Sequence, residues 1–189
     1  DMIHLDGNPI RLDVPWLFED SGINRVGDRY WYTYCSNFMT SGNTLRLTDG
    51  AIQYMVSDNS IGPYTYMGEL FPNEGRFFGI YGNNHHSIAC LNGEWYLFYH
   101  IRPVEKAMGI TGNYRSPQVD RISFGEDGLP LQVTGTMKGP AQLKPFEPFR
   151  IVPAATMSRE AGITVEGEGT DTRITGEAGC WIRISGVES

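Results

Sequence analysis

The sequence predicts an all-β fold that contains blades of a β-propeller. The first observation is a repeat, because hydrophobic positions of one stretch recur 65 residues later, Ile23 as Ile88 and Tyr34 as Tyr99. The second is composition, since 12% aromatic residues with 23 Gly and 11 Pro favour strands and turns over helices. A repeat of this length with several short strands in each copy is typical of propeller blades.

The first copy of the repeat contains several predicted strands, separated by turn signals at Gly27-Asp28 and Gly62-Pro63. Aromatic and β-branched residues are concentrated between these turns, which is the pattern of half-buried strands. The predicted strands cover residues 17–26, 29–36, 51–57 and 64–70. Four strands are the usual number for one blade.

The second copy has the same order of elements, with a favoured hairpin dipeptide at Asn92-Gly93. Its predicted strands cover residues 85–91, 94–101, 117–124 and 129–133. Helix signals are nearly absent, and residues 103–109 predict at most one turn. Two Gly-, Asn- and Thr-rich loops, 39–50 and 71–84, have a size that often shapes a binding cleft.

The chain divides into three predicted parts. Residues 1–136 form the blades, and residues 137–153 are predicted to be a linker because four Pro residues interrupt any regular element. Residues 154–189 are again strand-like but too few for an ordinary independent core, so they predict the beginning of a further, truncated module. The strand-like runs of this tail are 162–165, 173–175 and 180–184.

Charge and hydropathy exclude several classes of partner. A net charge of −7 argues against nucleic acid or an anionic membrane, because both need a basic surface. No apolar run approaches the ~18–20 residues that span a bilayer. These residues contain no signal peptide, although Asp1 is not a natural start and a targeting segment could lie upstream or have been removed. Cys35, Cys90 and Cys180 lack metal-binding spacing, and buried free thiols are favoured over a disulfide.

Ionisable residues occur where each copy of the repeat begins. The 65-residue offset places Glu19 and Asp20 on Asn84 and His85. Because equivalent residues of successive blades point at one shared centre, Glu19 and His85 are predicted to line one pocket. Asp20 is the nearest alternative acid, but strand alternation sends its side chain to the opposite face.

Three motifs, in order along the chain, resemble glycoside hydrolase family 43. Residues 15–23, with their Phe-Glu pair, and the aromatic strand 30–34 resemble the general-acid segment of the family. The Asn-Asn-His run in 83–88 and the aromatic strand 93–100 resemble its last blade. The Arg-Ser run and the following Asp-Gly in 114–128 resemble a later strand. The resemblance is nearest to arabinoxylan-debranching enzymes and β-xylosidases.

The resemblance covers roughly residues 9–135. It implies a five-bladed propeller, of which this chain supplies about the last two blades. It also implies hydrolysis, with inversion, of arabinose- or xylose-containing plant polysaccharide by a secreted or periplasmic enzyme. Residues 151–182 resemble the opening strands of a family-6 carbohydrate-binding module, which is a β-sandwich.

Inversion requires a protonated carboxyl that donates to the leaving oxygen and an ionised one, about 6.5–9.5 Å away, that activates water. Glu19 matches the acid of the family, and its apolar neighbour Phe18 is expected to raise the carboxyl pKa. The alternative is a surface carboxylate at a strand end. The base and a second Asp of the family lie upstream of this segment. Asp1, Asp6 and Asp13 lack the Asp-Pro context of the family, so neither role is assigned to them.

His85 matches the pocket histidine of the family, which contacts a bound calcium ion directly or through water. Calcium otherwise prefers oxygen ligands, so this ion would be structural, and the chemistry itself requires no cofactor. A plain hydrogen-bonded histidine is the alternative. His86 and His100 are expected to be structural.

Arg115 matches a family arginine that reaches the substrate, and its planar guanidinium suits paired sugar hydroxyls. The alternative is an ion pair with Asp120 or Glu94. The other residues expected to contact sugar are Asn84, through its amide, and Trp16 and Phe38, through apolar faces. Most aromatic residues of such a chain nevertheless belong to its core.

The main alternative function is a non-catalytic carbohydrate-binding propeller or an inactive fragment of such a hydrolase. A propeller scaffold for protein contacts is a second alternative. The resemblance implies that the remaining blades lie on the same or a second chain. Without them, the chain is expected to expose aromatic patches around Tyr32 and Leu97, to associate and to show no turnover.

Overall fold

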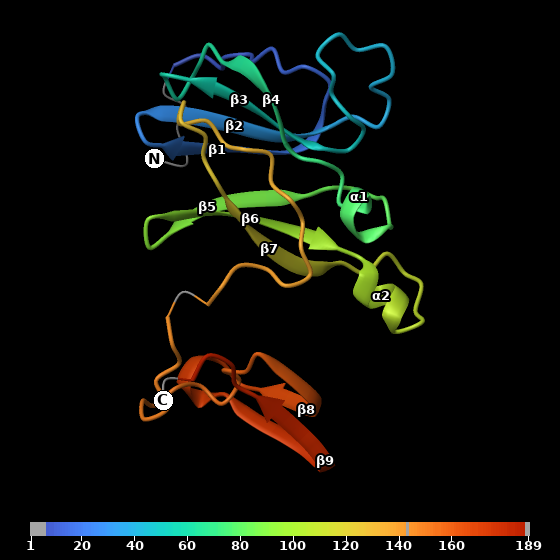
Figure 1. Cartoon of the computed structure of the whole chain (residues 1–189), viewed down its shortest axis with the longest axis vertical. Helices are drawn as coiled ribbons and strands as arrows, with labels where there is room; N and C mark the ends of the chain where they lie inside the picture. The colour runs from blue at the N-terminus through green and yellow to red at the C-terminus, as the bar shows by residue number, and fades with distance from the viewer. Residues whose placement is uncertain (1–6, 143, 188–189) are drawn as a thin grey trace. The chain divides into compact units, whose positions relative to one another are not determined.

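The computed structural model describes residues 7–142 and 144–187 and divides the chain into two compact units, Asp1–Pro140 and Ala141–Ser189 (Figure 1). The division falls inside the Pro-rich range 137–153. Strands dominate both units, so the fold is all-β as predicted. Among the described residues, none of the helices has the length and apolar character needed to traverse a bilayer.

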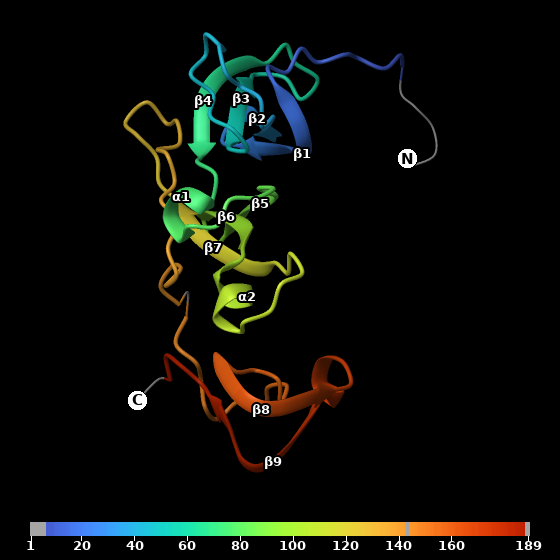
Figure 2. The same ribbon diagram turned by 90° about the vertical axis from the view of Figure 1, so that its right-hand side faces the viewer.

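The first unit contains two antiparallel sheets, which lie beside each other in both views (Figures 1 and 2). Their strand orders are β1-β2-β3-β4 and β5-β6-β7, so each strand pairs with its neighbour in the sequence. The strands are β1 (Leu17–Val26), β2 (Arg29–Ser36), β3 (Ile52–Ser57), β4 (Thr65–Phe71), β5 (His86–Leu91), β6 (Glu94–Ile101) and β7 (Ser116–Ile122). Every predicted strand up to residue 124 is present, with bounds within two residues of the prediction.

Strand pairing repeats with the same 65-residue offset as the sequence. In the first sheet Tyr34 of β2 lies opposite Gln53 of β3. In the second sheet Tyr99 of β6 lies opposite Gln118 of β7. The repeat of the sequence is therefore a repeat of strand pairing and register.

The predicted last strand of the second copy, residues 129–133, does not form. Phe124 and Pro130 make only an isolated bridge. The N–H of Val133 donates instead to the carbonyl of Leu70 in β4, at 2.8 Å. Pro130 has no N–H with which to extend a ladder on the second sheet. The segment after β7 therefore returns to the first sheet, as Figure 2 shows.

Two short helices lie in the connections. Helix α2 (Pro103–Ala107) agrees with the single turn predicted over 103–109. Helix α1 (Gly75–Phe78) lies within the 71–84 loop, for which the sequence predicts no regular element. The 39–50 loop contains neither helix nor strand, as expected.

One hydrophobic cluster joins the two sheets of the first unit. It contains Trp31 and Tyr54 from the first sheet, and Leu97, Tyr99 and Ile122 from the second. Contiguous burial of this kind makes the two sheets one packed body.

The expectation of open aromatic patches around Tyr32 and Leu97 is wrong. Tyr32 is only 8% exposed and Leu97 is 0% exposed. Tyr32 packs under Leu12 and Val14 of the preceding segment, and Leu97 belongs to the cluster between the sheets. Both residues lie on inner strands of their sheets, so neighbouring elements cover them. Half-exposed apolar side chains occur elsewhere on the sheets, among them Leu17, Phe18 and Ile23 on β1.

The second unit contains one antiparallel pair, β8 (Arg159–Glu166) and β9 (Arg173–Arg183), with a 3-10 turn at Gly169–Asp171 between them. The predicted run 173–175 and residues 180–183 of the predicted run 180–184 belong to the single strand β9, and the predicted run 162–165 lies within β8.

The three cysteines are free, as predicted. Cys35 is buried in β2, and Cys180 is partly buried. Cys90 is exposed on β5, where the sequence predicts a buried thiol. It lies beside the hairpin turn at the end of the strand, where neighbouring elements do not cover it.

Candidate active site

A break in strand pairing directs the side chains at the start of β1. Register shifts occur on both sides of Glu19, between Leu17 and Glu19 and between Glu19 and Gly22. Asp20 adopts a left-handed φ of 62°, which Asp tolerates better than most residues. An irregularity of this kind re-aims side chains, and here it sends Glu19 and Asp20 to different partners.

The Glu19 carboxyl is held by two residues that precede β5. The Asn83 amide donates to Glu19 Oε1 at 2.8 Å, and His85 Nε2 lies 2.8 Å from the same oxygen. The Glu19 side chain is 34% exposed and that of His85 is 39% exposed, so the pair is open to solvent on one side. The structure thus brings together the two residues that the sequence places in one pocket.

Arg115 fixes the tautomer of His85. Its Nη1 atom lies 3.4 Å from His85 Nδ1. A guanidinium can only donate, so Nδ1 accepts, and the other ring nitrogen, Nε2, carries the proton that bonds to Glu19. Glu19, His85 and Arg115 therefore form a chain of contacts at the edge of the first unit.

The alternative partners of Arg115 are engaged elsewhere. Glu94 contacts Arg121, and Asp120 accepts a hydrogen bond from the hydroxyl of Tyr99 at 2.6 Å. The ion pair that the sequence offers as an alternative role for Arg115 is therefore not formed, and its guanidinium lies beside His85 instead.

The predicted contact of His85 with a calcium ion stays a prediction. No group of three or more His, Cys, Asp or Glu side chains within 7–142 and 144–187 could hold a metal ion. Both ring nitrogens of His85 also have protein partners, Glu19 and Arg115.

Asp20 is tied to His86 and is not available as an acid. Its carboxylate accepts from the backbone N–H of His86 and contacts Nδ1 of the same residue. The second ring nitrogen of His86 lies 2.7 Å from the Thr33 hydroxyl. Burial alone would raise the pKa of Asp20, but the hydrogen bonds and charge of His86 outweigh it and lower the pKa. His86 is almost fully buried, in agreement with its expected structural role.

The prediction for Asn84 needs correction. Asn84 is fully buried, and its amide donates to the Pro72 carbonyl at 3.2 Å, so it is not placed to meet a sugar. Asn83 contacts Glu19 instead. The repeat offset aligns Glu19 with Asn84 and so conceals Asn83. The sequence did contain a signal for this contact, because the doublet Asn83-Asn84 offers two side-chain amides next to His85.

The general base of the hydrolysis is not assigned to any residue that the structure describes. The Asp13 side chain is 98% exposed and lies 3.8 Å from Arg11. Asp1 and Asp6 lie outside the described residues.

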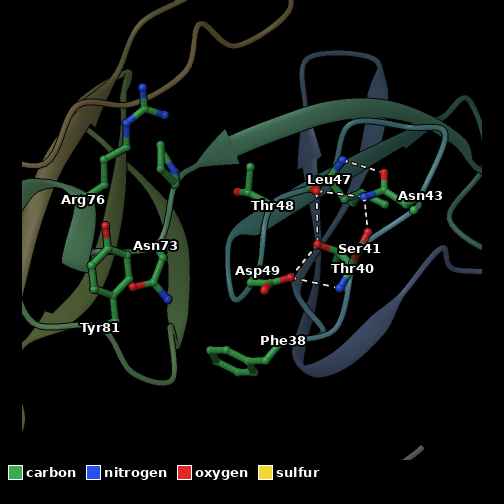
Figure 3. A pocket seen from close by; sticks show the side chains of 12 residues that line it. Phe38, Thr40, Ser41, Asn43, Leu47, Thr48, Asp49, Asn73, Arg76 and Tyr81 are labelled. Atoms are coloured by element: carbon green, nitrogen blue, oxygen red, sulfur yellow. Dashed lines mark hydrogen bonds between the residues drawn. The ribbon is translucent and has the colours of Figure 1, made fainter.

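Trp16 and Phe38 are the aromatic residues that were predicted to contact sugar. Trp16 and Phe38 are both partly exposed, and the carbonyl of Trp16 accepts from the N–H of Asn37 at 2.7 Å. The ring of Phe38 lies 5.5 Å from that of Phe18, edge to face. Phe38 also lines a cavity of about 700 Å³ between the 39–50 and 71–84 loops (Figure 3).

A cluster of buried polar groups, which the sequence analysis did not find, lies around the segment that carries Asn83 and His85. Burial raises the pKa of Glu74 to about 7, although the charge of Arg102 acts in the opposite direction. Burial also lowers the pKa of His100 to about 4, and His100 Nε2 accepts from the His85 N–H at 3.3 Å. The buried atoms without a hydrogen-bond partner among the described residues are Glu74 Oε1, Glu74 Oε2, Asn84 Oδ1, His100 Nδ1 and Arg102 Nε.

Glu74→Gln is expected to remove a loss of stability that occurs as the pH rises to neutrality. The pKa of Glu74 rises from 4.5 to about 7 in the folded state, so the folded protein binds this proton more tightly than the unfolded chain. The contribution of Glu74 to stability therefore falls as pH rises from about 5 through 7, by on the order of 2–3 kcal/mol. Urea unfolding of the full-length protein at pH 5 and pH 8 measures this. Glu126→Gln, at an exposed position, is the control, and an equal pH dependence in wild type and Glu74→Gln would contradict the prediction.

The comparisons with known proteins point to one family of enzymes, although no family model matches the chain. The chain is 42% identical over 167 residues to an arabinoxylan arabinofuranohydrolase of Paenibacillus polymyxa, a match that covers 88% of this chain and 26% of the relative. It is 33% identical over 198 residues to an arabinoxylan arabinofuranohydrolase of Bacillus subtilis (strain 168), with 100% of this chain and 38% of the relative covered.

The fold is similar to the crystal structure of a glycoside hydrolase family 43 arabinoxylan arabinofuranohydrolase from Bacillus subtilis in complex with cellotetraose. The TM-score is 0.83 with 34% identity, over 90% of this chain and 37% of that one. The chain thus spans only 26% to 38% of the curated relatives' own length. A family-6 carbohydrate-binding module in residues 154–189 finds no support in these matches and stays a prediction. This chain is homologous to one region of the glycoside hydrolase family 43 arabinoxylan arabinofuranohydrolases and xylosidases.

Proposed function

We propose that this chain is part of an inverting glycoside hydrolase that acts on arabinose- or xylose-containing plant polysaccharide, with Glu19 as the general acid. The hydrogen bonding of the Glu19 carboxyl carries this proposal. Asn83 and His85 both contact Oε1 of Glu19. The other carboxyl oxygen, Oε2, has no hydrogen-bond partner among the residues that the structure describes. One oxygen is thereby held in place while the other can carry the proton to the leaving glycosidic oxygen.

The neighbouring residues have supporting roles in this proposal. His85 holds Glu19, and Arg115 holds His85 while its remaining N–H groups are available to sugar hydroxyls. Phe38 and Trp16, both partly exposed, offer apolar faces to a sugar ring. The names of the relatives, two of which are arabinoxylan arabinofuranohydrolases, support the choice of substrate.

The rest of the proposal concerns the enzyme as a whole. The two sheets of the first unit are blades of a five-bladed propeller, and the repeated strand register supports this. The base carboxylate, about 6.5–9.5 Å from the acid, comes from the part of the enzyme outside this chain. Residues 154–189, after the linker 137–153, are the beginning of a carbohydrate-binding module. The enzyme is secreted or periplasmic, because its polymeric substrate lies outside the cell.

The anomeric form of the first product tests the proposed function. Full-length enzyme is incubated with arabinoxylan or an aryl arabinofuranoside, and proton NMR follows the released sugar before mutarotation. Inversion predicts that this sugar first appears in the anomeric configuration opposite to that of the cleaved bond. Release with retained configuration would overturn the proposed mechanism. Binding of arabinoxylan without any release would favour the non-catalytic carbohydrate-binding alternative.

A further inference from the structure

The connection between β6 and β7 contains a buried carboxylate that the proposed acid chemistry does not use. Residues 102–115, which include helix α2, make this connection (Figure 1). The strand residues at its two ends, Ile101 and Ser116, are paired with each other. Every residue from 106 to 115 is exposed. Glu105 is the buried residue of α2, and its side chain is only 8% exposed. A carboxylate that is buried beside an exposed loop needs partners for its oxygens.

The two oxygens of Glu105 hold two ends of the same connection. Arg102 Nη2 donates to Oε1 at 2.9 Å, and the backbone N–H of Tyr114 donates to Oε2. The hydrogen bonds from Arg102 and Tyr114 lower the pKa of Glu105, against the effect of burial. The carboxyl is therefore ionised at neutral pH, and both of its oxygens accept. Arg102 directly follows β6 and Tyr114 lies shortly before β7, so one side chain joins the start of the connection to its end.

The N–H that Glu105 fixes belongs to the residue before Arg115. The Arg115 guanidinium in turn lies 3.4 Å from His85 Nδ1, and His85 Nε2 lies 2.8 Å from Glu19 Oε1. Arg115 is exposed. Packing around its own side chain therefore restrains it little, and the backbone next to it determines where the guanidinium can reach. A series of contacts thus leads from the buried Glu105 to the proposed acid.

The position of Glu105 favours a local effect over a global one. A loop in which residues 106–115 are all exposed covers little apolar surface, so it contributes little to the stability of the whole unit. An ion pair between residues of one helical turn would also form at the surface and does not require burial. The contact with Tyr114 is the one that reaches beyond α2, and it fixes the residue next to Arg115.

We infer that Glu105 is a positioning residue for the acid Glu19, because it holds the end of the 102–115 connection so that Arg115 stays within reach of His85. The inference rests on the proposed function and adds to it a residue that contacts neither the acid nor the sugar. When this hold is lost, the exposed Arg115 takes up other orientations and His85 Nδ1 loses its donor. The proton on Nε2 that bonds to Glu19 is then no longer fixed at that nitrogen.

Hydrogen exchange in the full-length enzyme tests the hold without any activity. In wild type, the Tyr114 amide is expected to exchange about tenfold or more slowly than those of Thr111 and Asn113, although all three residues are exposed. In Glu105→Gln one amide oxygen cannot accept from both donors, so this protection is expected to be lost. Glu94→Gln removes a Glu–Arg contact from the same sheet and is the matched control, which should keep the protection. A Tyr114 amide that exchanges as fast as its neighbours in wild type would overturn the inference.

A double-mutant cycle tests whether Glu105 acts through Arg115. Glu105→Gln is expected to lower kcat/KM on arabinoxylan about tenfold, and in the Arg115→Ala background it should cause no further loss. With an aryl arabinofuranoside that has an acidic phenol, the loss should be smaller, since this leaving group needs little protonation. A purely structural defect would lower the rates on both substrates equally. Losses that multiply in the double variant, or full activity of Arg115→Ala, would also contradict the inference.

Failure of the proposed function would give a different result. A wild-type enzyme that cleaves neither substrate, or equal losses on both substrates in Glu19→Gln, would overturn the role of Glu19 as the acid. The exchange of the Tyr114 amide would still decide whether Glu105 holds the connection. Because the wild-type exchange measurement needs no variant, it also decides this if Glu105→Gln does not fold.

Discussion

Replacing Glu19 by Gln in the full-length enzyme is expected to lower kcat/KM on arabinoxylan by roughly 10²–10⁴-fold, the range that general-acid catalysis contributes. The amide keeps the shape of the carboxyl, and its oxygen can still accept the hydrogen bonds of Asn83 and His85. It cannot release a proton to the leaving oxygen. Steady-state rates on the polymer measure the loss, and the thermal unfolding temperature verifies that the variant is folded.

The loss is expected to depend on the leaving group. An aryl glycoside with an acidic phenol leaves with little protonation, so Glu19→Gln should affect its hydrolysis only mildly. Equal losses on both substrates would mean that Glu19 binds the sugar rather than donating a proton. Asp13→Asn removes an exposed carboxylate of the same chain and is the control for a general effect of lost charge.

The strand pattern could be predicted because each sheet of the first unit is built from local hairpins. Sequence neighbours pair with one another in both sheets, so turn signals and aromatic spacing are sufficient to place β1 to β7. The segment after β7 could not be placed in this way. Val133 donates to Leu70, which is far away in the sequence, and no local pattern identifies that acceptor.

The proposed site was predictable to the extent that the repeat reflects the fold. The offset aligns Glu19 with Asn84, but it places the start of β1 beside the segment before β5, and Glu19 does contact His85 of that segment. The 65-residue offset did not identify Asn83 as a partner of Glu19. An alignment by fixed offset cannot represent the register shifts of β1 around Glu19. The buried position of Glu74 was equally hidden, because burial in a loop depends on which distant segments cover it.

Trp31 is a large, fully buried residue in the packing of the first unit. Its side chain is 1% exposed, in the cluster that joins the two sheets. Its ring lies 5.8 Å from that of Tyr54 in β3 and 5.7 Å from that of Phe124, which follows β7. One side chain thus links the first sheet to the chain that leaves the second.

Trp31→Ala is therefore expected to destabilise the full-length enzyme by about 3–5 kcal/mol, through the lost burial and the cavity left between the sheets. Urea unfolding gives this value directly. Met67→Ala, at a partly exposed position of β4, is the matched control and should cost less than about 1 kcal/mol. Because the ring packs between the first sheet and the segment that leaves the second, the loss should also appear in activity at temperatures where wild type is still folded. A cost for Trp31→Ala no larger than that of the control would mean that the two sheets do not depend on this cluster for their packing.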